Sequence, residues 1–129
     1  MADGLIVRAD VDGIIIDLDK DGDERTGWVL YYLHLATNKR ASVGQEVKVG
    51  EPVGYPSCEG GSSTGTHIHV ARKYNGEWIL ADGPLAFNFE DWVAHSEGEA
   101  YKGTLTRGPL KVEACECSDA ASQIKSETP

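Results

Sequence analysis

The sequence lacks any long apolar run. No stretch approaches the roughly 20 apolar residues that a membrane-spanning helix needs. Its first ten residues, MADGLIVRAD, also lack the basic region and apolar core of a secretion signal. We therefore expect neither a membrane span nor a signal peptide within these 129 residues.

Positive charge is also scarce. The chain has 12 lysines and arginines against 21 aspartates and glutamates, which gives a formal net charge of -9. Its basic residues form no cluster dense enough to follow a phosphate backbone. This charge balance argues against a nucleic acid as partner.

Cysteine is limited to Cys58, Cys115 and Cys117. The odd count leaves two alternatives open: Cys58 pairs with one of the two later cysteines, or all three are thiols in a reducing compartment. The closely spaced Cys115 and Cys117 lack the two-residue spacer and the second pair that a structural zinc knuckle requires.

Long stretches with helical spacing of apolar residues are missing, whereas 15 glycines and short β-branched runs are present. This pattern predicts a mainly β fold, a single compact antiparallel β-sheet or β-sandwich domain. We expect a β core over residues 1–80, an extension over 81–117 and a polar tail over 118–129.

Several short strands are expected in the core. LIVRAD and GIIIDLD flank the turn dipeptide Asp12-Gly13, and KYNGEWI forms a hairpin around Asn75-Gly76. VGQEVKVGEPVG fits a strongly bent hairpin. In WVLYYLHLA, alternation places Trp28, Leu30, Tyr32 and His34 on one face. For the extension we expect a short helical turn over 90–95 and one strand over 102–107.

Two of the four histidines lie one residue apart in GSSTGTHIHVAR. In a strand, His67 and His69 share one face while Ile68 and Val70 share the other. Two imidazoles on one face suit a metal ion or catalysis. The alternative is a surface strand with a polar face.

An acidic loop follows the second strand. Asp17, Asp19, Asp21 and Asp23, with Gly22 among them, match the first half of an EF-hand calcium loop, although Trp28 occupies the position of the bidentate glutamate. The loop is therefore either a calcium site or a solvated acidic hairpin tip.

Three segments, taken in order, carry a family resemblance: Tyr32-Leu33-His34-Leu35, VGQEVKVGEPVG and GSSTGTHIHV. Their order and spacing over about residues 5–80 resemble the lysostaphin-type zinc metalloendopeptidases, the LytM-like family that cuts peptidoglycan peptides. The resemblance implies zinc as cofactor, a peptidoglycan peptide as substrate, and a location outside the cell or in the cell envelope.

The resemblance also implies residue roles. His69 corresponds to a zinc ligand, and His34 and His67 to catalytic histidines beside the metal. Zinc lowers the pKa of bound water, and the two histidines can orient that water, accept its proton or stabilise the oxyanion. Tyr32 and the small-residue loop are candidate substrate-binding residues, and the alternative is that the loop is a flexible connector. The candidates are Tyr32, Ser62, Ser63, Thr64 and Gly65.

The sequence departs from the family in one respect. The family takes two further zinc ligands from a His-x-x-x-Asp motif, which these residues lack. Two explanations are open: an N-terminally truncated hydrolase with little activity as given, which the retained histidines favour, or a degenerate, non-catalytic relative that binds the cell wall or activates amidases. The bond cleaved and the oligomeric state are left open.

Overall fold

The computed structural model describes residues 1–117 and 119–127. Residues 118, 128 and 129 of the expected polar tail lie outside the described residues. The described chain divides into two compact units, Met1–Ile79 and Leu80–Pro129. Each unit has its own antiparallel sheet, so the mainly β fold is confirmed.

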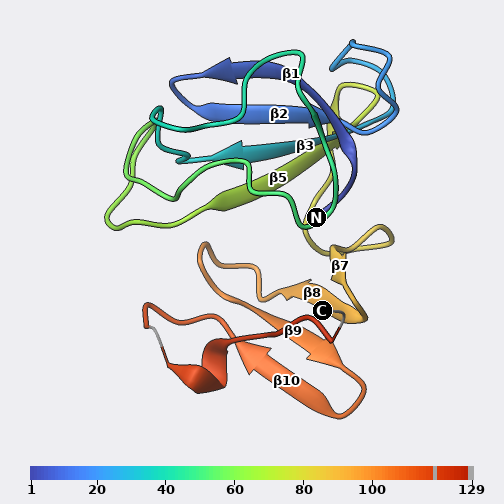
Figure 1. Ribbon diagram of the computed structural model, residues 1–129. Coiled ribbons are helices and arrows are strands. Elements are labelled where there is room, and N and C mark those ends of the chain that lie inside the picture. Colours follow the sequence, from blue (N-terminus) through green and yellow to red (C-terminus); the bar gives the residue numbers. More distant parts are fainter. Residues whose placement is uncertain (118, 128–129) are drawn as a thin grey trace. The chain divides into compact units, whose positions relative to one another are not determined.

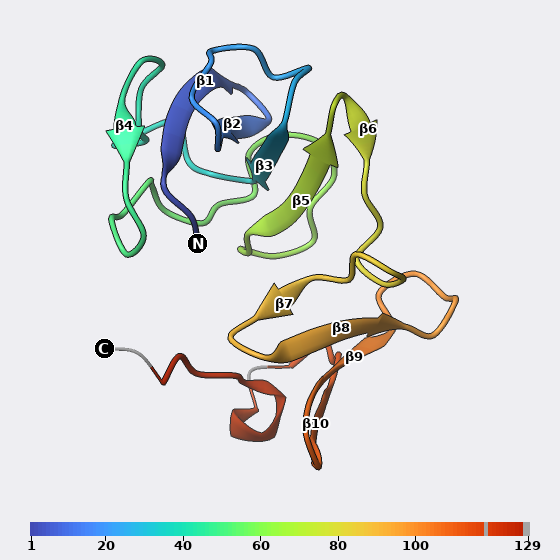
Figure 2. The ribbon, with the colours of Figure 1, turned by 90° about the vertical axis from the view of Figure 1, so that its right-hand side faces the viewer.

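Unit 1 contains a six-stranded sheet in the order β4-β1-β2-β3-β5-β6. Figure 1 shows β1, β2, β3 and β5 side by side, and Figure 2 shows the short β4 and β6 at the two edges. Every pairing in this sheet is antiparallel. The strands are β1 (Gly4–Asp10), β2 (Gly13–Asp17), β3 (Trp28–Leu33), β4 (Glu46–Val47), β5 (His69–Tyr74) and β6 (Glu77–Trp78).

Two tight turns form at or within one residue of the predicted positions. Val11 and Asp12 close the β1–β2 hairpin, in which Asp10 pairs with Gly13, the first residue of β2. Asn75 and Gly76 close the β5–β6 hairpin with φ of 47° and 79°. Positive φ at both central residues suits the right-handed twist of a two-residue hairpin.

The hydrophobic core of unit 1 lies against one face of the sheet. Ile14 and Ile16 of β2 and Leu30 and Tyr32 of β3 belong to this core, as the predicted alternation requires. It also contains Ile6, Leu35, Ala41 and Val47. His34 breaks the alternation, because β3 ends at Leu33 and His34 adopts a φ of 63°.

The segment VGQEVKVGEPVG does not form the expected hairpin. Two of its residues, Glu46 and Val47, form β4 and pair with Leu5 and Gly4 of β1. Val47 is buried in the core, whereas Val43 and Val49 are 61% and 65% exposed. Only one of these three valines reaches the core. The segment therefore adds a two-residue strand to the edge of the sheet and does not form a hairpin.

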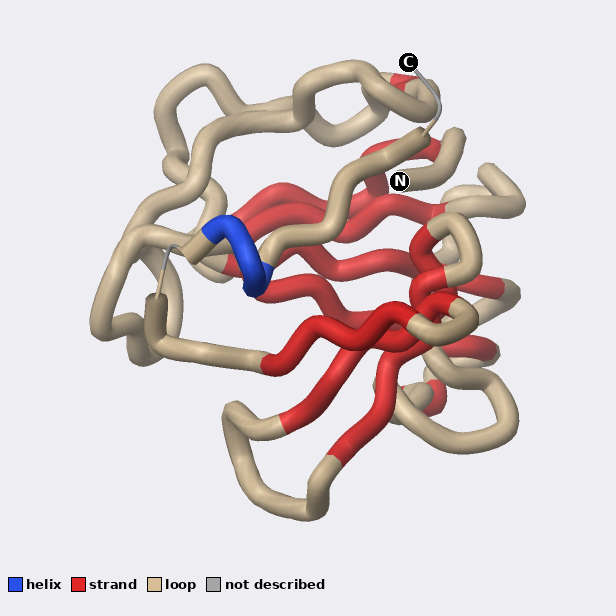
Figure 3. Tube along the Cα trace, turned by 90° about the horizontal axis from the view of Figure 1, so that it is seen from below, coloured by secondary structure: helices blue, strands red, loops and turns tan. Residues whose placement is uncertain are grey.

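Unit 2 contains a four-stranded sheet in the order β10-β9-β8-β7. Figure 3 shows the strands in red and the short helical turn in blue. The strand expected over residues 102–107 is confirmed as β9, and three strands that were not expected join it in a sheet of the extension's own. Its elements are β7 (Asn88–Phe89), β8 (Trp92–Ser96), β9 (Gly103–Arg107), β10 (Leu110–Glu113) and the 3₁₀ helix η1 (Ala120–Ser122).

The helical turn expected over residues 90–95 is wrong. Glu90 and Asp91 have φ of 52° and 68°, outside the right-handed helical region, and form the turn between β7 and β8. Residues 93–96 then pair with β9, and Trp92 pairs with Phe89 of β7. Burial of Trp92, which is 6% exposed, favours the strand over the local helical pattern.

The cysteines pair locally. Cys115 and Cys117 form a disulfide, and Cys58 is a free, exposed thiol. Neither alternative left open by the sequence is found: the possible partners of Cys58 are bonded to each other, and the three cysteines are not all thiols. Among the described residues, no helix has the length and apolar character needed to cross a membrane.

Candidate functional site

Three histidines from two distant segments come together in unit 1. His34 directly follows β3. His69 is the first residue of β5, which pairs with β3 so that His69 faces Leu33, and His67 lies two residues before this strand. The ring centroids of His34 and His67 are 4.5 Å apart, and those of His34 and His69 are 6.4 Å apart. Ile68 and Val70 pack against the core, whereas His67 and His69 are exposed, as their spacing predicts.

The backbone of His34 is held in an unusual conformation. A φ of 63° is uncommon for a residue with a side chain, and such conformations persist only where neighbours fix them. Here the His34 N–H donates to the Asp12 carbonyl at 3.1 Å, and the His34 carbonyl accepts from the Ser57 N–H at 2.7 Å. These contacts turn the buried imidazole, 5% exposed, out of the strand and towards His67.

Backbone carbonyls fix the tautomers of two histidines. Nδ1 of His34 lies 3.0 Å from the Glu59 carbonyl, and Nδ1 of His67 lies 2.7 Å from the Gly65 carbonyl. Because a carbonyl only accepts, each Nδ1 carries the proton in the neutral ring and each Nε2 keeps a lone pair. Both rings therefore present Nε2 as a base or a metal ligand.

The electrostatics of the cluster favour neutral imidazole. Partial desolvation, followed by the proximity of His34 and His67, lowers the pKa of His69 below its ordinary value. Neutral imidazole is the form that binds a metal ion. His69 is therefore suited to the ligand role that the resemblance implies.

The donor type fits zinc, but the set is incomplete. The three side chains are imidazoles, which zinc prefers. Within residues 1–117 and 119–127, however, the histidines do not each place a ring nitrogen within 4.8 Å of the other two, whereas Asp17, Asp19 and Asp21 do so with carboxylate oxygens. A tetrahedral site would need further ligands.

A cavity of about 160 Å³ lies on the sheet face opposite the core. Its charged lining comes from Arg8, Asp10 and Asp12. Tyr31 and Trp78 line it with aromatic rings, together with Leu33, which faces His69 in the strand register. The rings of Tyr31 and Trp78 are 5.1 Å apart, and Arg8 donates to the Tyr31 hydroxyl at 2.6 Å. The cavity therefore continues the sheet face on which His69 lies.

The predicted substrate-binding residues lie in different environments. Ser62, Thr64 and Gly65 are exposed, and the Ser63 hydroxyl donates to the Gly65 carbonyl at 2.8 Å. The same carbonyl accepts from His67, so part of the loop positions a histidine. Tyr32 is 8% exposed and belongs to the core, where burial raises its pKa.

Sequence reasoning missed Ser57 and Glu59. The Ser57 hydroxyl donates to the His34 carbonyl at 2.9 Å and accepts from the Glu59 N–H at 3.0 Å. Ser57 also forms a β-bridge with His67. No motif in YPSCEG signals these roles, because they depend on backbone atoms that the fold brings together.

The acidic loop lies at the other end of β3. Asp17 pairs with Val29 near the start of β3, whereas Gly13 pairs with Leu33 beside His34. Burial raises the pKa of Asp17, and the Asp19 and Asp21 carboxyls add to this rise. The acidic loop and the histidine cluster are thus separate features of unit 1.

Protease LasA from two strains of Pseudomonas aeruginosa is 38% and 35% identical to this chain over 65 residues. The match covers 45% of this chain but only 15% of each relative. No family model matches the sequence.

A solved structure shows the same fold. The deep-sea M23 metalloprotease pseudoalterin matches with a TM-score of 0.64 and 22% sequence identity, over 88% of this chain and 66% of that one. The fold and the LasA similarity confirm the resemblance to lysostaphin-type peptidases that the three motifs predict.

Proposed function

We propose that the chain is a lysostaphin-type zinc metalloendopeptidase domain for peptidoglycan peptides, acting outside the cell or in the cell envelope. The main support for this proposal is that His34, His67 and His69 lie close together. Backbone carbonyls face Nδ1 of His34 and of His67, so Nε2 of each ring remains available. Similarity to Protease LasA supports the peptidase class. Little hydrolysis is expected from residues 1–129 alone, because the histidines do not complete a zinc site.

His69 would hold the zinc ion, with ligands beyond these three histidines. A bound zinc ion supplies an activated water molecule and polarises a carbonyl. His34 and His67, whose Nε2 atoms have lone pairs, would accept a proton from that water or, once protonated, donate a hydrogen bond to a developing oxyanion. Glu59 and Gly65 keep both rings in the tautomer that this role needs.

The cavity beside Leu33 would receive the peptide. Tyr31 and Trp78 offer aromatic surface, and Arg8 offers a cation that is already paired with Glu24 at 3.2 Å. Trp78 is 58% exposed, so its ring is available for contact. Aromatic side chains with this exposure are typical of binding surfaces.

The first test is zinc titration by calorimetry in a Cys58→Ser background, which removes the exposed thiol as a competing ligand. His69→Ala should weaken zinc binding at least tenfold. The matched control is His95→Ala, which removes the unit 2 histidine bonded to Thr106 and should leave zinc affinity unchanged. Equal zinc affinity in wild type and His69→Ala would contradict the assigned ligand.

The second test measures loss of turbidity of purified peptidoglycan with added zinc, and co-sedimentation with it. Hydrolysis should be slow and should disappear in His67→Ala. Trp78→Ala should weaken co-sedimentation, whereas Tyr101→Ala, which alters a 94% exposed ring in unit 2, should not. Binding without zinc-dependent hydrolysis would instead support the non-catalytic alternative. The incomplete set of zinc ligands favours this alternative.

A further inference from the structure

The loop between β2 and β3 gathers three carboxylates. Asp17, Asp19 and Asp21 each bring one oxygen within 4.8 Å of the other two. Two oxygens bound to one calcium ion lie at most about 5 Å apart, since each Ca–O distance is about 2.3–2.6 Å. The spacing therefore already suits a shared ion.

One oxygen in this group is buried and without a partner. Asp17 is fully buried; its Oδ2 accepts from the Gly22 N–H at 2.8 Å, but its Oδ1 has no hydrogen-bond partner among the described residues. An unpaired buried carboxylate oxygen is costly in free energy. A cation between the carboxylates would satisfy it.

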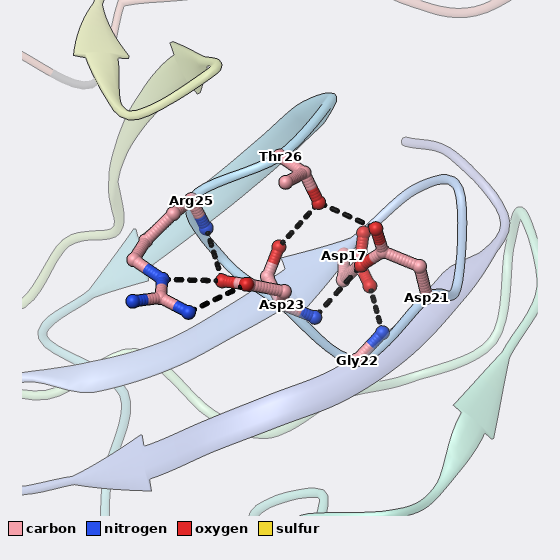
Figure 4. Close-up of polar contacts among 6 residues, drawn as sticks. All are labelled: Asp17, Asp21, Gly22, Asp23, Arg25 and Thr26. Carbon is pink, nitrogen blue, oxygen red and sulfur yellow. Dashed lines mark hydrogen bonds and ion pairs between the residues drawn. The ribbon is translucent and has the colours of Figure 1, made fainter.

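The basic side chains of the loop are engaged elsewhere. Lys20 pairs with Glu46 at 2.8 Å, and Arg25 pairs with Asp23 at 2.7 Å. Figure 4 shows the Asp17 and Asp21 carboxyl groups close together, with Arg25 directed at Asp23. Asp23 is therefore paired with Arg25 and does not join the other three carboxylates as a calcium ligand, in contrast to the role that the sequence predicted.

The backbone makes room for the cluster at Gly27. Gly27 has a φ of 62°, and a Cβ atom there would collide with Asp19 Oδ2. A side chain at position 27 would therefore displace the Asp19 carboxylate from its present place. The Gly27 N–H donates to the Asn75 side chain at 2.8 Å.

We propose that Asp17, Asp19 and Asp21 form a calcium site that fastens the β2–β3 loop. Carboxylate oxygens suit calcium, which accepts irregular coordination geometry, whereas magnesium demands a near-ideal octahedron. Three carboxylates fall short of the six to eight oxygens that calcium takes, and Trp28 replaces the bidentate glutamate, so backbone oxygens and water would complete the shell. We expect a dissociation constant on the order of 0.1–1 mM, as in weak calcium modules.

The test is calorimetric titration of the full chain with calcium chloride after treatment with EGTA, at pH 7 and constant ionic strength. One calcium per chain should bind, and 5 mM calcium should raise the melting temperature by about 5 °C. Magnesium at the same concentration should have a smaller effect. Equal responses to calcium, magnesium and sodium would overturn the proposal.

Variants locate the site. Asp19→Asn should weaken calcium affinity at least tenfold, while Asp23→Asn removes the same charge from the same loop and should change it less than threefold. Asp17→Asn is the second variant: it should abolish the calcium-induced rise in melting temperature without lowering the melting temperature in EGTA. Wild-type affinity in both Asp17→Asn and Asp19→Asn would overturn the site. His69→Ala should leave calcium affinity unchanged, so this test and the zinc test fail independently.

Discussion

Ser57 donates two hydrogen bonds to the carbonyl of His34, from its N–H at 2.7 Å and from its hydroxyl at 2.9 Å. The same hydroxyl accepts from the Glu59 N–H at 3.0 Å, and the Glu59 carbonyl faces Nδ1 of His34. One small side chain thus connects the backbone of His34 to the residue that orients its ring.

Ser57→Ala should destabilise unit 1 by about 1–2 kcal/mol, because the hydroxyl loses a part-buried hydrogen bond to the His34 carbonyl and an exposed one from the Glu59 N–H. Urea unfolding measures this change. Ser62→Ala, at an exposed serine of the neighbouring loop, should lie within about 0.5 kcal/mol of wild type. Equal stability of both variants would show that Ser57 does not hold His34 in place.

Gly60→Ala should be more destabilising than Gly50→Ala. Both glycines have positive φ, 73° and 85°, but a Cβ at Gly60 would lie 2.5 Å from the Val11 carbonyl oxygen and 2.8 Å from Asp12 Cα, whereas a Cβ at Gly50 meets nothing. We expect a loss of about 2–3 kcal/mol for Gly60→Ala and about 1 kcal/mol for Gly50→Ala. Similar urea midpoints would argue against this close backbone approach.

Glu59→Gln should change how stability depends on pH. The Thr37 hydroxyl and N–H donate to the Glu59 carboxylate and lower its pKa below the ordinary 4.5. A lowered pKa in the folded state stabilises the fold above pH 4.5, and this contribution disappears as the pH falls through the folded-state pKa.

Melting temperatures of wild type and Glu59→Gln, measured from pH 7 to pH 3, test this sign. Wild type should have the higher melting temperature at pH 7, and the difference in melting temperature between the two proteins should disappear towards pH 3. Glu116→Gln, at an exposed glutamate of unit 2, serves as the control. A difference that widens on acidification would refute the assigned direction.

Trp92→Ala should destabilise unit 2 by about 3–5 kcal/mol, because its ring is 6% exposed and lies beneath the Arg107 guanidinium at 4.9 Å. The loss should appear in the urea unfolding of the full chain. Trp78→Ala, which removes a ring that is 58% exposed, should cost much less. Similar losses of stability in the two variants would mean that burial of the Trp92 ring does not stabilise unit 2 as proposed.

The sequence predicted best where a local rule determines the structure. Asn75 and Gly76 form a hairpin turn because both residue types tolerate positive φ, and the β1–β2 turn lies within one residue of the predicted Asp12-Gly13. Ile68 and Val70 are separated from His67 and His69 by their alternation along the chain. It predicted less well where distant contacts decide. The strand of residues 92–96 depends on pairing with β9, and Val43 and Val49 are exposed although they resemble Val47.

The histidine cluster shows the same limit. Alternation along the strand predicts that His34 lies on the same face as Tyr32. In the structure the strand ends before His34, which has a φ of 63°. The contacts that hold it come from Asp12, Ser57 and Glu59, which lie far from it in the chain. The sequence around residue 34 therefore does not predict the positive φ of His34, because other segments of the chain impose it.

Pairing of β3 with β5 also makes the histidine cluster a reporter of folding. His34 directly follows β3 and His69 begins β5, and these two strands are joined by six residue pairs. A chain lacking β5 would lose His69 and retain His34 and His67, and a chain interrupted between residues 36 and 66 would depend on strand reassociation to restore the cluster. Any property that needs all three histidines should therefore appear and vanish together with the pairing of β3 and β5.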